Sequence, residues 1–301
     1  MSLFDRLVDE ALRNQHGLAT LRTVVEKELL HHDILRVMSS AGLLVGLTFM
    51  GGTCLRACYG SSRLSEDMDF TGGLDFNRTI LDGLGPLLVE RLQEKYGLPV
   101  EVDEPRREAG NVATWKLRIQ VRPGRNDLPS QRINIDIYAI PSHDARPMML
   151  RNHYGVDMGT GGLILRAQSR EEILADKIVA LALRPNRLKN RDLWDIAWLC
   201  QHGVMAPLSL VPGKLLDHHC EQQVFLSSLE ERRLALHDKP ALAADFRRGM
   251  RRFLPAPLMH ETVEQQAFWQ YLTTLIAGQC QAVHDFLTST PPAQVYKMDA
   301  H

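Results

Sequence analysis

Two aspartates separated by one residue are the first group in the sequence whose types and spacing indicate chemistry. They are Asp67 and Asp69, in the segment SEDMDF. Alternate side chains of an extended strand share a face, so both carboxylates would point the same way while Met68 turns toward the core. Adjacent carboxylates repel each other unless a cation lies between them, and oxygen-rich sites suit Mg²⁺, which is commonly held by one or two carboxylates plus substrate phosphates. The pair therefore predicts a Mg²⁺ site for a phosphate-containing substrate.

A glycine pair and a threonine lie upstream of these aspartates. Gly51 and Gly52 end an apolar run, and glycine lets the backbone turn and approach a ligand closely. Thr53 adds a hydroxyl donor, and the helix expected after it would offer its positive amino end to a phosphate. Arg56 and Arg63 in that helical segment are expected to contact phosphate or to face solvent. The combination favours nucleotide binding over the alternative of a turn followed by an acidic edge strand.

The elements that must position these residues follow from the hydrophobic pattern. Apolar residues at helical spacing predict helices over 7–40, and the apolar run 44–50 predicts a short buried strand that ends at the glycine pair. Apolar and polar residues alternate over 115–121 and again over 133–138, which predicts two half-buried strands. The loop between them contains two prolines and a glycine, so these strands are expected to be antiparallel neighbours.

Together these features resemble the GG[ST]…DxD signature of the polymerase-beta-like nucleotidyltransferases. That superfamily carries a third carboxylate on a later strand, and Asp136 matches it on the polar face of an alternating strand. The resemblance implies two Mg²⁺ ions held by Asp67, Asp69 and Asp136. Asp136 would act as general base or bridging ligand in a two-metal in-line displacement on an NTP. The alternative is that Asp136 pairs with Lys116 or Arg118 across a hairpin.

Two helical segments after these strands narrow the resemblance. EEILADKIVALALR and RLKNRDLWDIAWL look like the helical signature of the AbiEii/AbiGii-type toxin branch, and the resemblance covers about residues 45–200. The capping-box spacing of Ser169 and Glu172 predicts where the first helix begins. In that branch a lysine on the first helix and an aspartate on the second are needed for activity. By motif these are Lys177 and Asp192.

Charge spacing on these helices is consistent with such roles. Lys177 and Arg184 are seven residues apart and share a helix face, so both are expected to reach triphosphate oxygens. Asp192 and Asp195 lie one turn apart. One of them is expected to orient Lys177 or Lys189, while the other caps the helix or pairs with Arg191.

Composition places the chain among ordinary proteins with a packed core. Its 301 residues are 45% hydrophobic and 24% charged with a net charge of −1, which excludes the disordered and fibrous classes. The longest apolar stretch, 41–50, is about half of the ~20 residues that span a bilayer, and the amino end lacks a signal-peptide pattern. We expect a cytoplasmic protein without membrane contact. Five scattered cysteines lack the paired spacing of structural zinc sites and are expected to be reduced thiols.

Strand signals disappear after about residue 165, which predicts two parts. Residues 1–165 are expected to form amino-terminal helices and an α/β (α+β) nucleotidyltransferase core with a mixed sheet, and residues 166–301 an all-helical carboxy-terminal domain. The helical part would form one wall of the NTP cleft. Trp194 and Trp198 are expected to pack in the core or between helices rather than to stack on bases.

The predicted function is transfer of a nucleoside monophosphate from an NTP to an acceptor hydroxyl, with release of pyrophosphate. The resemblance further implies an RNA acceptor, at a tRNA 3′ end, and a toxin restrained by a separately encoded antitoxin protein. The alternatives are a small-molecule acceptor, a protein acceptor, or a catalytically silent nucleotide- or partner-binding module. A basic wall joining the arginines of 184–191 to those of 247–252 would favour RNA, whereas a closed pocket would favour a small molecule.

Overall fold

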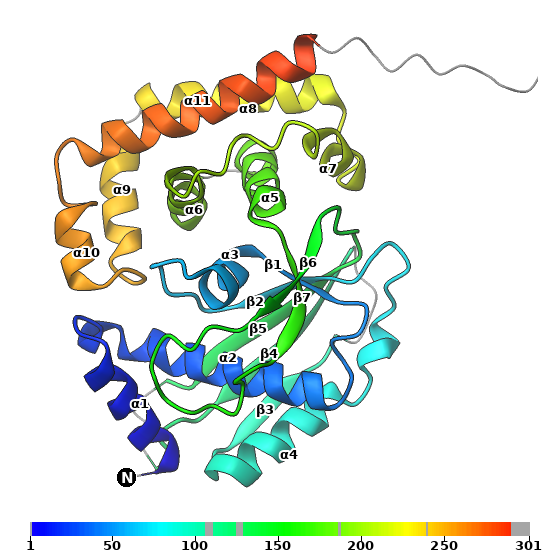
Figure 1. Cartoon of the computed structure of the whole chain (residues 1–301), viewed down its shortest axis with the longest axis vertical. Coiled ribbons are helices and arrows are strands. Elements are labelled where there is room, and N and C mark those ends of the chain that lie inside the picture. The colour runs from blue at the N-terminus through cyan, green and yellow to red at the C-terminus, as the bar shows by residue number, and fades with distance from the viewer. Residues whose placement is uncertain (1, 106–110, 125–128, 186–187, 239, 290–301) are drawn as a thin grey trace, which may run out of the picture.

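A mixed sheet with helices on both faces organises the molecule (Figure 1). The structure, a computed structural model, describes residues 2–105, 111–124, 129–185, 188–238 and 240–289. Within them a seven-stranded sheet has the order β3-β4-β5-β2-β1-β7-β6. The strands are β1 (Thr48–Met50), β2 (Met68–Thr71), β3 (Val100–Asp103), β4 (Val112–Ile119), β5 (Gln131–Tyr138), β6 (Ala145–Met149) and β7 (Ile164–Gln168). The predicted α/β class with a mixed sheet is confirmed.

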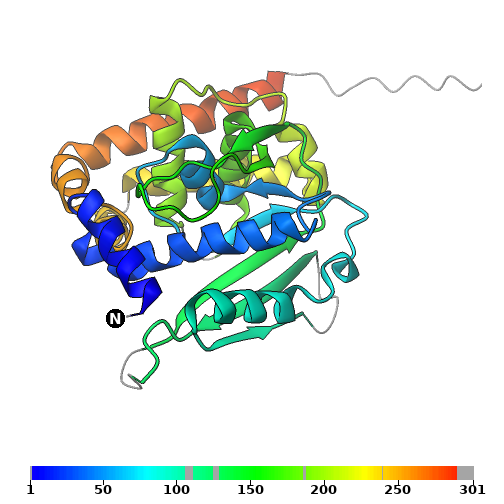
Figure 2. The same ribbon diagram turned by 60° about the horizontal axis from the view of Figure 1, so that its bottom comes forward.

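Helices cover both faces of this sheet. On one side lie α1, α2 and α4, and on the other α3, α5 and α6, beyond which α8 and α11 form an outer layer (Figures 1 and 2). The helical elements are α1 (Leu3–Asn14), η1 (Ala19–Leu21), α2 (Arg22–Ser40), α3 (Gly51–Cys54), the π-helical η2 (Leu55–Tyr59), η3 (Arg78–Leu81), α4 (Leu84–Tyr96), α5 (Arg170–Leu183), α6 (Asn190–Gln201), α7 (Val211–Asp217), α8 (Gln222–Asp238), α9 (Pro240–Met250), α10 (Ala256–Glu261) and α11 (Phe268–Ser289).

The register between strands decides which polar side chains meet. β2 runs parallel to β5 and places Asp69 opposite Asp136. β1 is antiparallel to β2 and places Met50, the residue before the glycine pair, opposite Asp69. The strands β4 and β5 are antiparallel neighbours, as predicted. Because β5, β2 and β1 are adjacent, the glycine pair and two of the predicted carboxylates come together.

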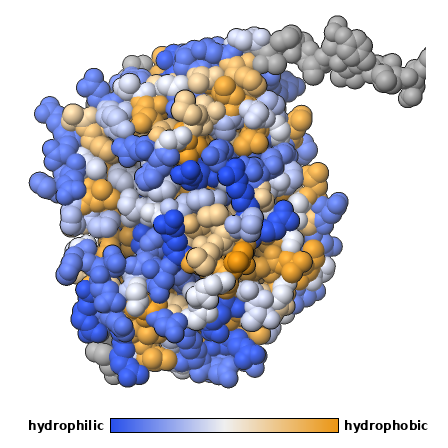
Figure 3. Space-filling view, viewed as in Figure 1, coloured by the Kyte–Doolittle hydropathy of each residue, from blue (hydrophilic) through white to orange (hydrophobic). Residues whose placement is uncertain are grey.

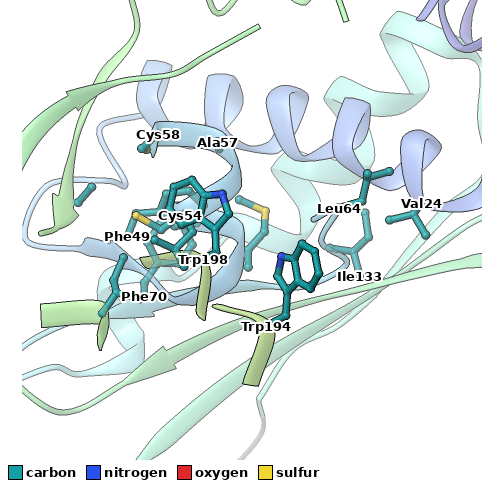
Figure 4. Packing of buried hydrophobic residues seen from close by; sticks show 14 of the residues in the cluster. Val24, Phe49, Cys54, Ala57, Cys58, Leu64, Phe70, Ile133, Trp194 and Trp198 are labelled. Atoms are coloured by element: carbon teal, nitrogen blue, oxygen red, sulfur yellow. The ribbon is translucent and has the colours of Figure 1, made fainter. Parts of the chain in front are cut away.

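One continuous apolar core supports this arrangement. It contains side chains from the sheet, such as Phe49 and Phe70, and from α6, including Trp194 and Trp198. Figure 4 shows both tryptophans in the same cluster as Cys54 of α3. Trp194 and Trp198 are 6% and 7% exposed, so their predicted packing role is confirmed. On the outer face seen in Figure 3, apolar side chains are interspersed among hydrophilic ones.

The strand before the glycine pair is shorter than predicted. The strand expected over 44–50 is confined to β1, because the chain turns at Gly42 and Gly46, whose φ angles are 71° and 82°. Only glycine adopts such values without strain. These turns leave Val45 79% exposed instead of buried in the sheet.

The helices that follow the sheet begin and end close to the predicted positions. β7 extends to Gln168, so the change from strands to helices falls slightly after residue 165. Ser169 Oγ accepts a hydrogen bond from the backbone N–H of Glu172 at 3.0 Å and caps α5. α6 spans the residues predicted for it. No helix in the described ranges is long and apolar enough to cross a membrane.

The buried alternation of β5 gives a direct test of this core. Ile135 is 0% exposed and lies opposite Met68, so Ile135→Ala should lower the free energy of unfolding by about 2–5 kcal/mol through lost burial and a cavity. Val45→Ala removes exposed methyl groups and should change it by less than ~0.5 kcal/mol. Urea denaturation of both variants measures the difference, and equal effects would contradict the assigned core.

Candidate active site

Three carboxylates gather where β2 and β5 lie side by side. Asp69 on β2 faces Asp136 on β5 in register, and Asp67 directly precedes β2. The backbone N–H of Asn134 donates to Asp67 Oδ1 at 3.2 Å, which holds that side chain over β5. Within the described part of the chain, none of the three carboxylates is engaged in an ion pair. Aspartates locked into salt bridges within the protein would have supported the silent binding module. These three are not locked in that way.

The surroundings of Asp136 decide between its two predicted roles. Its Oδ1 accepts a hydrogen bond from the Thr114 hydroxyl at 2.6 Å, across the β4–β5 ladder. Lys116 lies opposite a different residue of β5, and Arg118 lies 3.8 Å from Glu101. The alternative of an ion pair across the hairpin is therefore wrong.

Burial and mutual repulsion make this group electrostatically costly. Burial, followed by the charge of Asp136, raises the pKa of the Asp69 carboxyl to about 6, although Lys189 and Lys177 partly oppose this. Burial also raises the pKa of Asp136, and Asp67 adds to the effect. The free-energy cost of holding these carboxylates in their charged form falls if a cation lies among them. The site is therefore prepared for positive charge.

The donor set fits a magnesium ion that arrives with a nucleotide. Within the described ranges, no three His, Cys, Asp or Glu side chains converge closely enough to enclose a metal ion by themselves. Mg²⁺ typically keeps waters and takes one or two protein carboxylates, with phosphate oxygens completing an octahedron. An open group made of Asp67, Asp69 and Asp136 matches that requirement better than an all-protein cage. The two-ion arrangement stays a prediction.

Helix α3 begins at the glycine pair itself, and each glycine has its own steric reason. Gly51 has φ of 73°, and a Cβ there would lie 3.0 Å from Asp69 Oδ2. A Cβ on Gly52 would overlap the guanidinium of Arg63. Met50, the N-cap residue, makes no side-chain capping hydrogen bond. The start of α3 therefore lies next to Asp69 without a side-chain cap.

Thr53 has a different role from the one expected. It is 2% exposed, and its hydroxyl donates to the backbone carbonyl of Asp67 while lying 2.6 Å from Ser65 Oγ. A hydroxyl has a single proton to donate. The prediction that Thr53 donates to phosphate is therefore corrected: the side chain ties α3 to the segment that carries Asp67.

Both arginines of the segment after the glycines are also corrected. Arg56 Nε donates to Glu28 Oε2 at 3.0 Å, and Arg63 donates two bonds to Asp195, at 2.8 Å and 2.9 Å. Both guanidiniums are buried. Both guanidiniums are turned away from solvent and paired with a carboxylate from another part of the chain, because a buried guanidinium requires such a partner.

The predicted lysine and aspartate of the two helices do come together. Lys177 Nζ lies 2.5 Å from Asp192 Oδ1 and 3.0 Å from Asp195 Oδ2. Arg184 pairs with the other oxygen of Asp192. Burial alone would raise the pKa of Asp192, but Lys177, Lys189 and Arg184 together hold it below its usual value. Asp192 thus fixes both cations that were expected to reach a triphosphate.

Two further residues belong to the site that the sequence did not single out for it. Lys189, the N-cap residue of α6, lowers the pKa of both Asp69 and Asp136 by its charge, so it lies close enough to act on both carboxylates. Tyr138 follows Asp136 by two residues on β5, and burial, then the charges of Asp69 and Asp136, raise the pKa of its hydroxyl. Strand alternation was a sufficient signal for Tyr138. Lys189 lies on a loop, where no such periodicity exists.

Two arginines packed over a buried aromatic ring lie next to the residue that precedes Asp67. The guanidiniums of Arg191 and Arg252 lie 4.9 Å and 5.7 Å from the centre of the Phe253 ring. Both arginines also approach Glu66, at 3.9 Å and 3.4 Å. Glu66 immediately precedes Asp67 in the chain. Arg252, which follows α9, therefore lies next to Arg191 of α6 at the edge of the site. The predicted pairing of Asp195 with Arg191 is not formed, because Asp195 pairs with Arg63.

Comparison with known proteins is consistent with this geometry. A family described as "Nucleotidyl transferase AbiEii toxin, Type IV TA system" matches residues 33–274, which is most of the chain. No curated protein sequence matches. The solved structure of MenT4, a nucleotidyltransferase toxin from Mycobacterium tuberculosis H37Rv, is 17% identical with a TM-score of 0.55, over 93% of this chain and 98% of that one.

Two solved structures from Helicobacter pylori are more distant in shape. JHP933 is 16% identical with a TM-score of 0.45, over 87% of this chain and 94% of that chain. A putative nucleotidyltransferase is 18% identical with a TM-score of 0.46, over 87% of this chain and 97% of that chain.

The raised pKa of Asp69 predicts a specific dependence of stability on pH. Folded Asp69 binds its proton more tightly than the unfolded chain, whose value is 3.8. Its favourable contribution is therefore complete below the unfolded pKa and is lost as the pH rises through about 6. The free energy of unfolding of Asp69→Asn, relative to wild type, should rise by ~2 kcal/mol between about pH 4.5 and about pH 7.5 in metal-free buffer.

Urea denaturation at both pH values measures this change. Asp75→Asn is the matched control, because Asp75 is an exposed carboxylate outside the cluster. The control should shift equally at both pH values. If the difference in free energy of unfolding between Asp69→Asn and wild type is the same at both pH values, the carboxyl does not change its protonation in this range.

Proposed function

The chain belongs to the AbiEii family of nucleotidyl transferase toxins, and from this premise we propose that it transfers a nucleoside monophosphate from an NTP to an acceptor hydroxyl on RNA. Pyrophosphate is the second product. The observation that carries the proposal is the β2–β5 register, which sets Asp69 against Asp136 beside the glycine pair. Asp192 anchors Lys177 and Arg184, and the charge of Lys177 acts on the carboxyl of Asp69.

The chain supplies both halves of an NTP site. Asp67, Asp69 and Asp136 would hold Mg²⁺, which when bound neutralises triphosphate charge and lowers the pKa of a coordinated hydroxyl. The N–H groups at the start of α3 and the ammonium of Lys177 would bind the phosphate oxygens. Because Lys177 is already fixed by two carboxylates, its placement requires little reorganisation when the nucleotide binds.

The proposed reaction is an in-line displacement at the α-phosphorus. The acceptor oxygen forms a bond to that phosphorus while the bond to the bridging oxygen of pyrophosphate breaks. Asp136, whose Oδ1 is fixed by the hydroxyl of Thr114, takes the proton of the acceptor hydroxyl. Arg184 and Lys189, both near Asp192, offset the charge that develops on the leaving pyrophosphate.

The surface around Phe253 supports RNA as the acceptor. Arg191 and Arg252 place two guanidiniums and an aromatic ring next to Glu66, one residue from the first aspartate. Guanidinium groups bind backbone phosphates. The buried ring of Phe253 holds these two guanidiniums in place, and it is not itself available to stack on a base. We propose a tRNA 3′ end as the acceptor.

A partner and a location complete the proposal. The matching family is described as a type IV toxin–antitoxin system, and MenT4 is described as a toxin. A separately encoded antitoxin protein is therefore proposed to restrain this enzyme. The cytoplasm, where NTPs and tRNA are both present, is the proposed place of action.

A labelling experiment tests the chemistry. Wild-type protein incubated with Mg²⁺, total bacterial RNA and each NTP labelled at the α-phosphate should label a tRNA-sized band. Asp69→Asn removes a ligand for Mg²⁺ and should lower the rate at least ~100-fold, which corresponds to ~3 kcal/mol in the barrier. Asp75→Asn, an exposed carboxylate outside the site, should retain wild-type activity.

The position of the label distinguishes the alternatives. Label on protein or on a small molecule would show that the RNA acceptor is wrong while the transfer chemistry is right. Binding of NTP without transfer from any of the four nucleotides would support the silent module.

The basic surface gives a separate prediction about RNA. Arg252 is exposed, and Arg252→Gln should weaken RNA binding several-fold and reduce the slope of its salt dependence by about one, because one phosphate contact is lost. The KM for NTP should not change. Arg91→Gln is the control, since Arg91 is an exposed arginine on α4. Filter binding of tRNA across a salt series measures the affinity and its salt dependence for each variant. Equal losses of affinity in Arg252→Gln and Arg91→Gln would show that RNA does not bind at Arg252.

A further inference from the structure

Arg63 and Asp195 form a buried pair that no step of the proposed reaction uses. We propose that the two are positioning residues, which set the place of the Lys177 ammonium relative to the glycine loop that opens α3. This inference rests on the proposed function, since it concerns how the NTP site is assembled. It follows from four observations on the contacts, burial and charge of these side chains.

The pair itself is fully desolvated and geometrically specific. Arg63 Nε and Nη2 donate to the two oxygens of Asp195 at 2.8 Å and 2.9 Å, and the side chains are 2% and 0% exposed. Desolvation of two ions usually cancels most of their attraction, so an apolar pair of similar volume would often serve stability as well or better. Stability alone therefore does not account for charged residues at these two positions.

Asp195 also contacts the lysine of the site. Its Oδ2 lies 3.0 Å from Lys177 Nζ, on which Asp192 Oδ1 also acts at 2.5 Å. The ammonium is thus held between carboxylates from consecutive turns of α6. Asp192 also pairs with Arg184. Asp195 gives Lys177 a second carboxylate contact, so the position of the ammonium does not depend on Asp192 alone.

Arg63 contacts the glycine loop on its other side. A Cβ on Gly52 would overlap Arg63 Nη2, so this nitrogen lies directly against the loop backbone. Arg63 Nη1 donates to the backbone carbonyl of Leu64 at 2.9 Å, and the guanidinium lies 5.9 Å from the centre of the Phe253 ring. Its position is therefore fixed on three sides. Contacts run without interruption from Gly52 through Arg63 and Asp195 to Lys177.

The charges of this chain explain why an arginine is needed. Asp192 and Asp195 alone would neutralise Lys177 and Arg184, so that only Lys189 would carry an unbalanced charge toward a triphosphate. Arg63 compensates Asp195 from the buried side, where it is inaccessible to the nucleotide. The three cations of this network then exceed its two carboxylates by one positive charge, to which Lys189 adds its own. Asp195 can therefore hold Lys177 in place without neutralising its positive charge.

The test is a pair of Asp195→Asn substitutions, one in wild type and one in the Lys177→Gln background. If Asp195 acts through Lys177, Asp195→Asn should lower kcat/KM for NTP by ~10–100-fold in wild type, because small misplacements of a binding group are costly. It should cause no further loss once Lys177 is replaced. The same ~10–100-fold loss in both backgrounds would overturn the proposal, since a general structural defect does not depend on Lys177.

Two further variants keep the test interpretable if Asp195→Asn does not fold. Arg63→Lys retains the charge but loses the two-pronged contact, and it should reproduce the kinetic loss in wild type and not in Lys177→Gln. Lys95→Met removes the 2.6 Å partner of another buried carboxylate, Asp33, and should alter thermal stability with kcat/KM unchanged. A kinetic loss in Lys95→Met equal to that in Arg63→Lys would contradict a positioning role.

Equilibrium binding of NTP separates this inference from the proposed function. If wild type transfers no nucleotide, the proposed function fails, and the affinities for NTP still report on Lys177. Asp195→Asn should then weaken NTP binding in wild type and leave it unchanged in Lys177→Gln. Equal weakening in both backgrounds would overturn the positioning role even where transfer is observed.

Discussion

The repulsion between two carboxylates on neighbouring strands is the constraint around which this molecule is built. The parallel pairing of β2 with β5 places Asp69 and Asp136 opposite each other, and Asp67 adds a third charge at the strand entrance. Burial intensifies the repulsion, as the raised pKa of Asp69 and of Asp136 shows. Positive charge placed near these central strands relieves the repulsion, and the cations of the following helices and a bound metal ion both meet that need.

Helices α5 and α6 provide that positive charge in a fixed form. Isolated cations facing the carboxylates would be mobile, and long side chains lose conformational entropy when a ligand orders them. Asp192 holds Lys177 and Arg184 in advance, so the entropy is lost on folding instead of on nucleotide binding. Burying such a network is costly, and the continuous apolar core around Trp194 and Trp198 supplies the stability that permits it.

Much of the site was predictable because its signals are local and periodic. The alternation of β5 places Asp136 on the polar face, and the single residue between Asp67 and Asp69 gives them a common side. Helix α6 was recognisable from its pattern, which put Asp192 on a helix that packs against α5. Geometry of this kind depends on backbone repeats of two or 3.6 residues, which a sequence displays directly. Family membership was recognisable for the same reason, since the motifs are short and contiguous.

The partners of buried charges were decided only by the tertiary structure. Arg63 and Asp195 are 132 residues apart, and Arg56 and Glu28 are 28 apart, so no periodicity connects either pair. The sequence by itself determined the strands, the helices and the residue types that could bind Mg²⁺ and phosphate. Only the tertiary structure decided that Arg63 is buried against Gly52 and paired with Asp195 instead of being exposed to bind a nucleotide. A buried ion pairs with whichever carboxylate the fold brings within reach.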